Sequence, residues 1–398
     1  MKILWAKTDF LHPTDRGGQI RTLEMLRRLH LRHEVHYVAY DNPETPEGRE
    51  RAREYSTNEF PVKRTIPPRN SPAFFAQLAA NMLSPMPLAV GRYRSRAMRR
   101  QISELIGKNR YDAIVADFLS ITPNFSDLSR CVLFQHNVEW RIWARHAQNA
   151  QNVIRKAYFG SQARRMETYE RRTCRTVHRV ISVSPVDSRT MREQFGVERV
   201  EEVPTGVDID YFHHPREIST TTDIVFVGAM DWLPNIDGLS WFASEILPLI
   251  RKSCPGCSLT IAGRNPTQEI RRLAESDPLI TVTGTVPDVR PFVWRAAISI
   301  VPLRIGGGTR LKIFEAMASG IPVVSTAIGA EGLAVTDGKD IVLADSPAAF
   351  AHAVVQLLGN AGWRAAISEA ALELVTRRFS WEAVTACFET ILESSLKQ

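Results

Sequence analysis

Three consecutive glycines followed by two cationic side chains form the segment of this sequence that is best suited to bind a phosphate. Glycines let a backbone approach a ligand closely because no Cβ stands in the way. A helix that begins just after them would point its first amides, and the positive end of its dipole, at the same ligand. Arginine and lysine add full charges suited to a diphosphate. The segment consists of Gly306, Gly307, Gly308, Thr309, Arg310, Leu311 and Lys312.

An acidic residue, Glu315, follows Lys312 about one helical turn further on. Its carboxylate would accept hydrogen bonds from neighbouring ribose hydroxyls, as acidic residues do in dinucleotide-binding folds. The segment lacks the ending of a Walker A loop, and no dinucleotide fingerprint follows the first strand. Taken alone, the glycines and cations are also compatible with a tight turn between a strand and a helix, with solvated charges.

Alternating strand and helix patterns surround this segment and predict a doubly wound α/β fold with parallel sheets. Apolar residues recur at helical spacing over residues 20–31, after a glycine turn. Strand patterns in the first half lie at residues 2–6, 33–39, 113–116, 132–134 and 179–183. In the second half they lie at residues 223–227, 258–262, 280–283, 298–302, 322–325 and 341–343. Ligands bind at the loops that follow the strands of such sheets.

The run from Val203 to Asp208 breaks this alternation, which then restarts. We therefore expect two Rossmann-like domains in tandem, divided between residues 204 and 205, with a cleft between them. The 398 residues of the chain suffice for two domains that each bury a core.

The composition excludes several classes of protein. With 44% hydrophobic and 23% charged residues, the chain is neither disordered nor of low complexity. The first apolar run ends at Lys7, too early for a signal peptide, and no uncharged stretch is long enough to span a membrane. Cys254 and Cys257 have no second cysteine pair, so we expect no metal site there. These features predict a cytoplasmic protein.

Positive charge is concentrated in the first half of the chain. Residues 1–200 contain 34 Lys and Arg against 20 Asp and Glu, whereas the remainder contains 16 against 23. The excess gathers at residues 92–100 and 155–179. It predicts attraction to an anionic membrane surface or a phosphorylated acceptor, although a solvated helix face would look the same. We do not expect nucleic-acid binding, because no aromatic residues alternate with the basic ones and no known module is present.

The run from Phe314 to Val324 resembles the signature of the family 4 glycosyltransferases of the GT-B fold, also called group 1 glycosyl transferases. Further matches cover most of the second half. In the first half the resemblance is weaker and consists of two short motifs at strand ends. The further matching segments lie at residues 205–208, 226–228, 261–263, 282–284 and 330–332, and the two short motifs lie at residues 17–18 and 136–137.

This resemblance implies retaining transfer of a sugar from a nucleotide-diphospho-sugar to a hydroxyl acceptor, without an obligatory metal or another cofactor. It implies that residues 1–204 bind the acceptor and that residues 205–378 bind the donor. Residues 379–398 would then form a helix that crosses back to the first domain. Asp208 and Asp210 look like a DxD metal motif, but the family commonly has such residues in this linker, so we expect them to be structural.

Two positions follow directly from the family's E-x7-E motif. Glu315 matches its second glutamate and should hold the ribose of the donor. Gly307 stands where the first glutamate would contact the sugar, so backbone amides would hold the sugar there. Val286 falls where relatives present backbone groups to the base.

The diphosphate clamp of many relatives is altered in this chain. Relatives place an arginine just after the glycine that corresponds to Gly228, and a lysine several residues further on. Here Ala229 follows the glycine and Asn235 is a neutral donor. Arg310 and Lys312 would therefore carry most of the charge that binds the phosphates.

The same comparison assigns roles in the first domain. Gly17 and Gly18 match the glycine loop that approaches the donor phosphate and the acceptor, and His136 matches a histidine that contacts the sugar. We expect Arg310, Lys312 and His136 to be the catalytic residues. In front-face attack the acceptor hydroxyl passes its proton to the departing phosphate oxygen, so no protein nucleophile is needed.

Together these features predict a hexosyltransferase that acts in the synthesis of envelope polysaccharide, lipopolysaccharide or glycolipid. The expected partners are a nucleotide-diphospho-sugar, a saccharide or lipid-linked acceptor and an anionic membrane surface, with the protein peripheral on the inner face of the plasma membrane. The alternative is a non-catalytic subunit that binds a sugar nucleotide for a partner enzyme, which the missing first glutamate at Gly307 keeps open.

Overall fold

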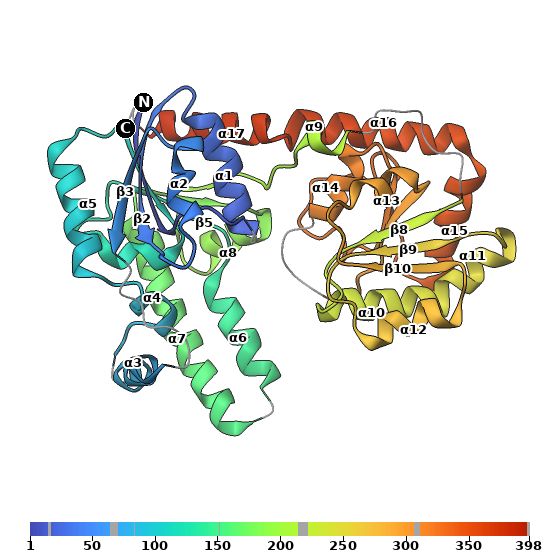
Figure 1. The fold of residues 1–398 in the computed structure, drawn as a ribbon, viewed down its shortest axis with the longest axis horizontal. Helices are drawn as coiled ribbons and strands as arrows, with labels where there is room; N and C mark the ends of the chain where they lie inside the picture. Colours follow the sequence, from blue (N-terminus) through green and yellow to red (C-terminus); the bar gives the residue numbers. More distant parts are fainter. Residues whose placement is uncertain are drawn as a thin grey trace. The chain divides into compact units, whose positions relative to one another are not determined.

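The computed structural model of the protein describes residues 1–14, 17–63, 71–82, 84–150, 152–213, 222–305 and 311–395. The chain folds into two compact units (Figure 1). The first contains Met1–Pro204 together with Val384–Gln398, and the second contains Thr205–Ala383. Among the described residues, no helix has both the length and the apolar content needed to cross a bilayer.

The described part of the first unit is built on a seven-stranded parallel sheet in the order β3-β2-β1-β4-β5-β6-β7. β4 and β5 are buried along their whole length, as expected for central strands of a parallel sheet. The strands are β1 (Lys2–Asp9), β2 (Glu34–Asp41), β3 (Asn58–Lys63), β4 (Ala113–Asp117), β5 (Cys131–Gln135), β6 (Arg179–Ser182) and β7 (Val200–Glu202).

Helices connect these strands, and several begin at a side chain that caps the first backbone amides, such as Ser95, Asn152 and Ser184. They are α1 (Gly17–Leu29), α2 (Glu47–Glu50), α3 (Pro72–Met82), α4 (Leu88–Gly91), α5 (Arg96–Lys108), α6 (Glu139–Asn149), α7 (Val153–Thr176) and α8 (Pro185–Glu193), with 3-10 turns at Ala52–Glu54 and Leu119–Asn124. The helix α1 already begins at Gly17, so the predicted glycine turn is the first turn of this helix.

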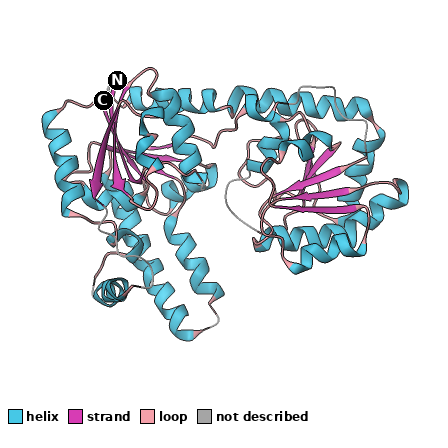
Figure 2. Cartoon of the chain, in the orientation of Figure 1, coloured by secondary structure: helices cyan, strands magenta, loops and turns pink. Residues whose placement is uncertain are grey.

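The described part of the second unit contains a six-stranded parallel sheet in the order β10-β9-β8-β11-β12-β13. Figure 2 shows helices on both faces of this sheet. The strands are β8 (Ile224–Val227), β9 (Leu259–Ala262), β10 (Ile280–Gly284), β11 (Ile298–Val301), β12 (Val323–Ser325) and β13 (Val342–Leu343). The helices are α9 (Ile209–Phe212), α10 (Leu233–Trp241), α11 (Leu247–Ser253), α12 (Gln268–Ser276), α13 (Arg290–Arg295), α14 (Leu311–Ala318), α15 (Pro347–Gly359), α16 (Ala361–Arg378) and α17 (Trp381–Ser394).

One predicted helix, over residues 236–250, is divided in the structure. A π-helical turn, Phe242–Ile246, separates α10 from α11. Pro248 has no amide hydrogen and cannot continue the regular hydrogen-bond ladder, which accounts for the break.

Both sheets confirm the predicted α/β class, and both have a topological switch point. The strand order reverses between β1 and β4 in the first unit and between β8 and β11 in the second. Ligands of doubly wound sheets bind outside the carboxyl ends of the strands at such points. The loops after these four strands are therefore the places to look for a site.

The final helix, α17, has residues in both units. Its residues from Val384 belong to the first unit, where Phe388 packs against Trp5 and Phe134 with ring centroids 5.5 and 5.2 Å apart. Glu389 pairs there with Arg32 at 2.5 Å.

The beginning of α17 is packed inside the second unit. Trp381 is buried, and its ring lies against Gly206 so closely that a Cβ at Gly206 would overlap it. The boundary segment between the units therefore depends on a glycine that no side chain can replace without a shift of the tryptophan.

We predict that Gly206→Ala lowers the free energy of unfolding by about 1–3 kcal/mol, because the added methyl group overpacks the contact with Trp381. Urea denaturation followed by tryptophan fluorescence measures this loss. Gly107→Ala is the control, since no atom lies within 4 Å of the new Cβ in helix α5. It should stabilise the protein by about 0.5–1 kcal/mol. Equal effects of the two substitutions would contradict the packing argument.

Candidate functional site

A buried ion pair lies at the switch point of the first sheet. The Lys7 ammonium is 2.8 Å from the Asp117 carboxylate, and both side chains are almost fully buried. Trp5 donates its indole N–H to the same carboxylate at 3.0 Å. The Thr22 hydroxyl accepts a hydrogen bond from Lys7 at 3.0 Å and lies 2.7 Å from Asp117. Asp117 thereby links β1, β4 and α1.

His136, at the end of β5, is bonded to the same carboxylate. Its Nε2 lies 2.8 Å from Asp117 Oδ1, and its Nδ1 lies 2.9 Å from a guanidinium nitrogen of Arg21. A guanidinium only donates, so Nδ1 accepts and the single ring proton sits on Nε2. Burial lowers the pKa of His136 to about 3, against the opposing pull of Asp117. The imidazole is therefore neutral.

The charges around His136 are balanced by the aspartate. Burial alone would raise the pKa of Asp117, but Lys7 and His136 hold it well below its usual range. Burial lowers the pKa of Lys7, and Asp117 opposes this shift. With Arg21 on one ring nitrogen and Asp117 on the other, neither nitrogen of His136 is available to a ligand until one of these partners moves.

The glycines at the start of α1 reach the same edge of the sheet. A Cβ on Gly18 would stand 2.7 Å from the Phe118 ring, which stacks on His136 with centroids 4.0 Å apart. Phe118 itself adopts a φ of 73°, a region that non-glycine residues rarely occupy. No atom lies within 4 Å of a Cβ built on Gly17. A Cβ on Gly18 would also stand 3.6 Å from Nδ1 of His136, so these two predicted residues lie close together, and their roles stay predictions.

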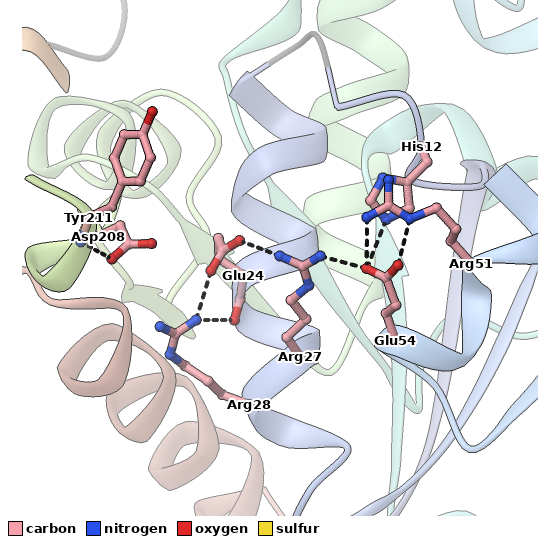
Figure 3. Close-up of polar contacts among 8 residues, drawn as sticks. All are labelled: His12, Glu24, Arg27, Arg28, Arg51, Glu54, Asp208 and Tyr211. Carbon is pink, nitrogen blue, oxygen red and sulfur yellow. Dashed lines mark hydrogen bonds and ion pairs between the residues drawn. The ribbon is translucent and has the colours of Figure 1, made fainter. Parts of the chain in front are cut away.

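A second polar network anchors the chain just before α1 (Figure 3). Glu54 accepts hydrogen bonds from Arg27 and Arg51, each at 2.5 Å, and lies 3.4 Å from Nε2 of His12. These hydrogen bonds, that of Arg51 above all, lower the pKa of Glu54 to about 2. Glu54 is therefore a carboxylate that holds α1 and the preceding loop to one place.

In the second unit, the side chain of Lys312 lies over the bare backbone of Gly228. The Lys312 ammonium donates to Asn235 Oδ1 at 2.9 Å and lies 4.1 Å from the centre of the Phe226 ring. A Cβ on Gly228 would come within 2.7 Å of this ammonium. The switch point between β8 and β11 therefore carries a cation above a glycine.

Asn235 holds the lysine in this position. Its amide nitrogen donates to the carbonyl oxygen of Ala229 at 2.7 Å while its oxygen accepts from Lys312. Asn235 is buried, so these bonds fix both ends of its side chain. Gly263, with φ of 155°, is in turn required because a Cβ there would overlap the carbonyl oxygen of Gly228.

Glu315 lies on the same short helix as Lys312. Its side chain is partly buried, and burial raises the pKa of its carboxyl to about 7, while Lys312 acts in the opposite direction. Leu311 is the first residue of α14. Val286 follows β10 and is half-buried. The predicted site residues Gly306, Gly307, Gly308, Thr309 and Arg310 lie outside the described residues.

Sequence reasoning missed several residues of this arrangement. Lys7, Thr22 and Asp117 were not singled out, although a lysine inside one apolar strand pattern and an aspartate at the end of another were visible signals.

Asp208 accepts a hydrogen bond from the backbone amide of Tyr211 at 2.9 Å and caps α9 (Figure 3). Such a cap fits the structural role expected for it.

We predict that Asp117→Ala lowers the free energy of unfolding by about 3–5 kcal/mol, because it leaves the buried Lys7 without its counter-charge. Chemical denaturation of the full chain measures the loss. Glu373→Ala is the control, since it breaks an exposed ion pair with Arg377 and should cost less than about 1 kcal/mol. If both variants lose the same small amount of unfolding free energy, the buried pair does not stabilise the fold as proposed.

Two family models match this chain, and together they identify its family. A model described as Glycosyltransferase Family 4 matches residues 16–211, and a model described as Glycosyl transferases group 1 matches residues 221–360. The chain is 23% identical over 375 residues to an uncharacterized 44.6 kDa protein in the cps region of Klebsiella pneumoniae, covering 90% of this chain and 91% of that protein. It is 29% identical over 230 residues to a phosphatidyl-myo-inositol mannosyltransferase of Mycobacterium leprae, covering 54% of this chain and 60% of that protein.

Solved structures of glycosyltransferases share the fold. Anabaena HepE in complex with UDP and glucose superposes with a TM-score of 0.64 at 14% identity, over 99% of this chain and 100% of HepE. A glycosyltransferase of Rickettsia africae gives a TM-score of 0.65 at 15% identity, over 100% of this chain and 99% of that one. The predicted GT-B fold is thus confirmed, and the chain belongs to the group 1 glycosyltransferases of family 4, enzymes of the hexosyltransferase type.

Proposed function

We propose that this enzyme transfers a hexose, with retention of configuration, from a nucleoside-diphosphate sugar to a hydroxyl group of a saccharide or lipid-linked acceptor. The observation that carries the proposal is the Lys312 ammonium, held over Gly228 at the switch point of the second sheet. The product would be an envelope polysaccharide, a lipopolysaccharide or a glycolipid.

The chemistry of the leaving group explains why a cation belongs at this position. Cleavage of the bond between the anomeric carbon and the diphosphate leaves negative charge on the phosphate oxygen. A group aimed in advance at that oxygen stabilises the transition state more than the bound donor. The Lys312 ammonium is oriented by its hydrogen bond to Asn235 and its contact with the Phe226 ring.

The remainder of the donor would extend along the same edge of the sheet. We assign the phosphates to Lys312 and Arg310 together with the glycines of residues 306–308, the ribose to Glu315, and the base to backbone groups near Val286. The first turn of α14 adds backbone amides and the positive end of a helix dipole. Asn235 acts on the phosphates through Lys312, because its amide nitrogen is bonded to Ala229.

For the transfer itself we propose front-face attack. The acceptor oxygen forms its bond to the anomeric carbon as the bond to the phosphate oxygen breaks, and the acceptor proton passes to that phosphate oxygen. His136 is assigned to the sugar as a neutral hydrogen-bonding group. This role requires Arg21 to release Nδ1 of His136, so that the ring can accept a hydrogen bond from a sugar hydroxyl.

Known proteins support the finer parts of this proposal. HepE binds UDP and glucose, one relative is named a mannosyltransferase, and another is encoded in a cps region. The UDP and glucose bound to HepE fit a nucleotide-sugar donor, and the mannosyltransferase fits transfer of a hexose. The cps region fits an envelope polysaccharide. A non-catalytic sugar-nucleotide-binding subunit is not favoured, because both matched families are transferases.

We predict that Lys312→Ala reduces turnover about a hundredfold, the usual loss when one group that stabilises a leaving anion is removed. Calorimetry with UDP-, GDP-, ADP- and dTDP-hexoses first identifies the donor, and release of its nucleotide is then measured. Lys339→Ala, which removes an exposed lysine of the same unit, is the control and should keep full activity. Full activity of the Lys312 variant would overturn the assignment of the phosphate site.

We further predict that donor affinity depends on the protonation of Glu315. Its pKa is about 7 in the free protein, and the ribose hydroxyls are bound by the carboxylate form. The nucleotide should therefore bind most tightly above pH 7 and weaken by up to tenfold per pH unit below it. Glu315→Gln should bind more weakly and show little change across this range. A wild-type affinity that is constant between about pH 8 and pH 6 would contradict the role of Glu315.

A further inference from the structure

Helix α3 exposes apolar side chains and turns its polar ones towards the protein, which is the reverse of what a surface helix of a globular protein normally does. It contains no ionisable residue. Its two amide side chains, Gln77 and Asn81, lie on the side that faces the protein, and Asn81 is buried. Phe75 and Met82, in contrast, are 55% and 62% exposed. The exposed residues of this helix are Pro72, Ala73, Phe75, Ala76, Ala79, Ala80 and Met82.

These exposed residues form one continuous face. At about 100° per residue they fall within one half of the helix circumference, and every one of them is apolar. Single exposed apolar side chains are normal on a protein surface, but a contiguous apolar face indicates an interaction site.

Polar contacts fix α3 with this face turned outwards. Gln162 of α7 donates to the Asn81 side chain at 3.2 Å, and Asn81 donates to the carbonyl oxygen of Met86 at 2.9 Å. The Arg165 guanidinium donates to the carbonyl oxygens of Asn81 and Met82 at 2.7 and 2.8 Å. The helix is therefore held by its polar side and C-terminal end, and its attachment does not use the exposed face.

The first turn of α7 also exposes apolar side chains. Val153 and Ile154 are 81% and 79% exposed, and the exposed Arg155 and Lys156 follow them directly. These residues lie about 16 Å along α7 from the contact with α3, and Figure 1 shows both segments at the end of the first unit away from the chain termini. Neither Arg155 nor Lys156 forms an ion pair with a described residue.

Some of the other basic residues of the first half contact groups of the protein itself. Arg99 donates to the carbonyl oxygen of Pro123, Arg175 to that of Phe195, and Arg179 pairs with Glu201. The cations that stay available for a partner therefore include those at the start of α7, next to exposed apolar side chains.

We propose that the exposed face of α3 and residues 153–156 of α7 form a docking surface for an anionic lipid bilayer. The apolar side chains would enter the boundary between headgroups and acyl chains, and Arg155 and Lys156 would lie at the headgroup phosphates. Membrane docking does not depend on the donor or the reaction, so it can be tested without either.

The structure favours a bilayer over a second copy of this chain. A stable protein interface buries about 800 Å² on each partner, whereas half the surface of an eleven-residue helix offers on the order of 300 Å². A two-fold symmetric contact would also bring two sets of the same cations into one interface. An anionic surface instead complements them.

The test is co-sedimentation of the purified full-length chain with vesicles of phosphatidylcholine, with and without phosphatidylglycerol. The wild type should bind the anionic vesicles, and added salt should weaken binding. Phe75→Ser combined with Met82→Ser should weaken it tenfold or more, because two apolar side chains lose their burial. Arg155→Glu combined with Lys156→Glu should have an effect of similar size.

Two matched controls separate the surface from general hydrophobicity and charge. Leu31→Ser removes another exposed apolar side chain of the first unit, and Arg110→Glu with Arg130→Glu makes the same change in net charge at other exposed positions. Both controls should bind the anionic vesicles within about twofold of the wild type. Circular dichroism checks that every variant is folded.

Absence of wild-type binding to anionic vesicles, or equal losses in the variants and their controls, would overturn the proposal. So would a dimer in sedimentation velocity that the α3 variants convert to a monomer, since the face would then belong to a second copy. Nucleotide binding in the absence of vesicles should be unchanged in every variant, so that failure of docking and failure of the donor assignment give different results.

Discussion

The first unit depends on the pairing of Lys7 with Asp117. A charge taken out of water without a partner costs several kcal/mol, so two strands that each bury one charge must place the two charges side by side. This requirement fixes how the end of β1 meets the end of β4. It also fixes the hydroxyl of Thr22 in α1 and the proton on His136, because both are bonded to the same carboxylate.

The second unit uses a lysine at the equivalent switch point in a different way. Lys7 is paired with a carboxylate inside the protein, whereas Lys312 donates a hydrogen bond to the neutral amide of Asn235. The first arrangement uses its charge to hold the fold together. The second presents a cation beside a glycine backbone and a helix N-terminus, which is the combination that a diphosphate requires. The same topology thus supports a structural ion pair in one unit and, as we propose, an anion site in the other.

The alternation of strands and helices could be read from the sequence because it follows from local spacing. The edge strand β3 was missed because it contains Pro61. A proline in a sequence argues against a strand, although an edge strand can accommodate one. The ion pair was missed because Lys7 and Asp117 are far apart in sequence and meet only when β1 pairs with β4. The exposed face of α3 was missed for a related reason: apolar spacing indicates a helix but not which side the fold covers.

The central claim is that a nucleoside diphosphate binds where Lys312 lies over Gly228. Hydrogen exchange of the full chain, measured by mass spectrometry with and without the nucleotide that the protein binds, tests it most directly. The account predicts slower exchange in peptides that cover Gly228–Asn235 and the first turn of α14, with no change in α12. Protection confined to the first unit, or none at saturating nucleotide, would contradict it.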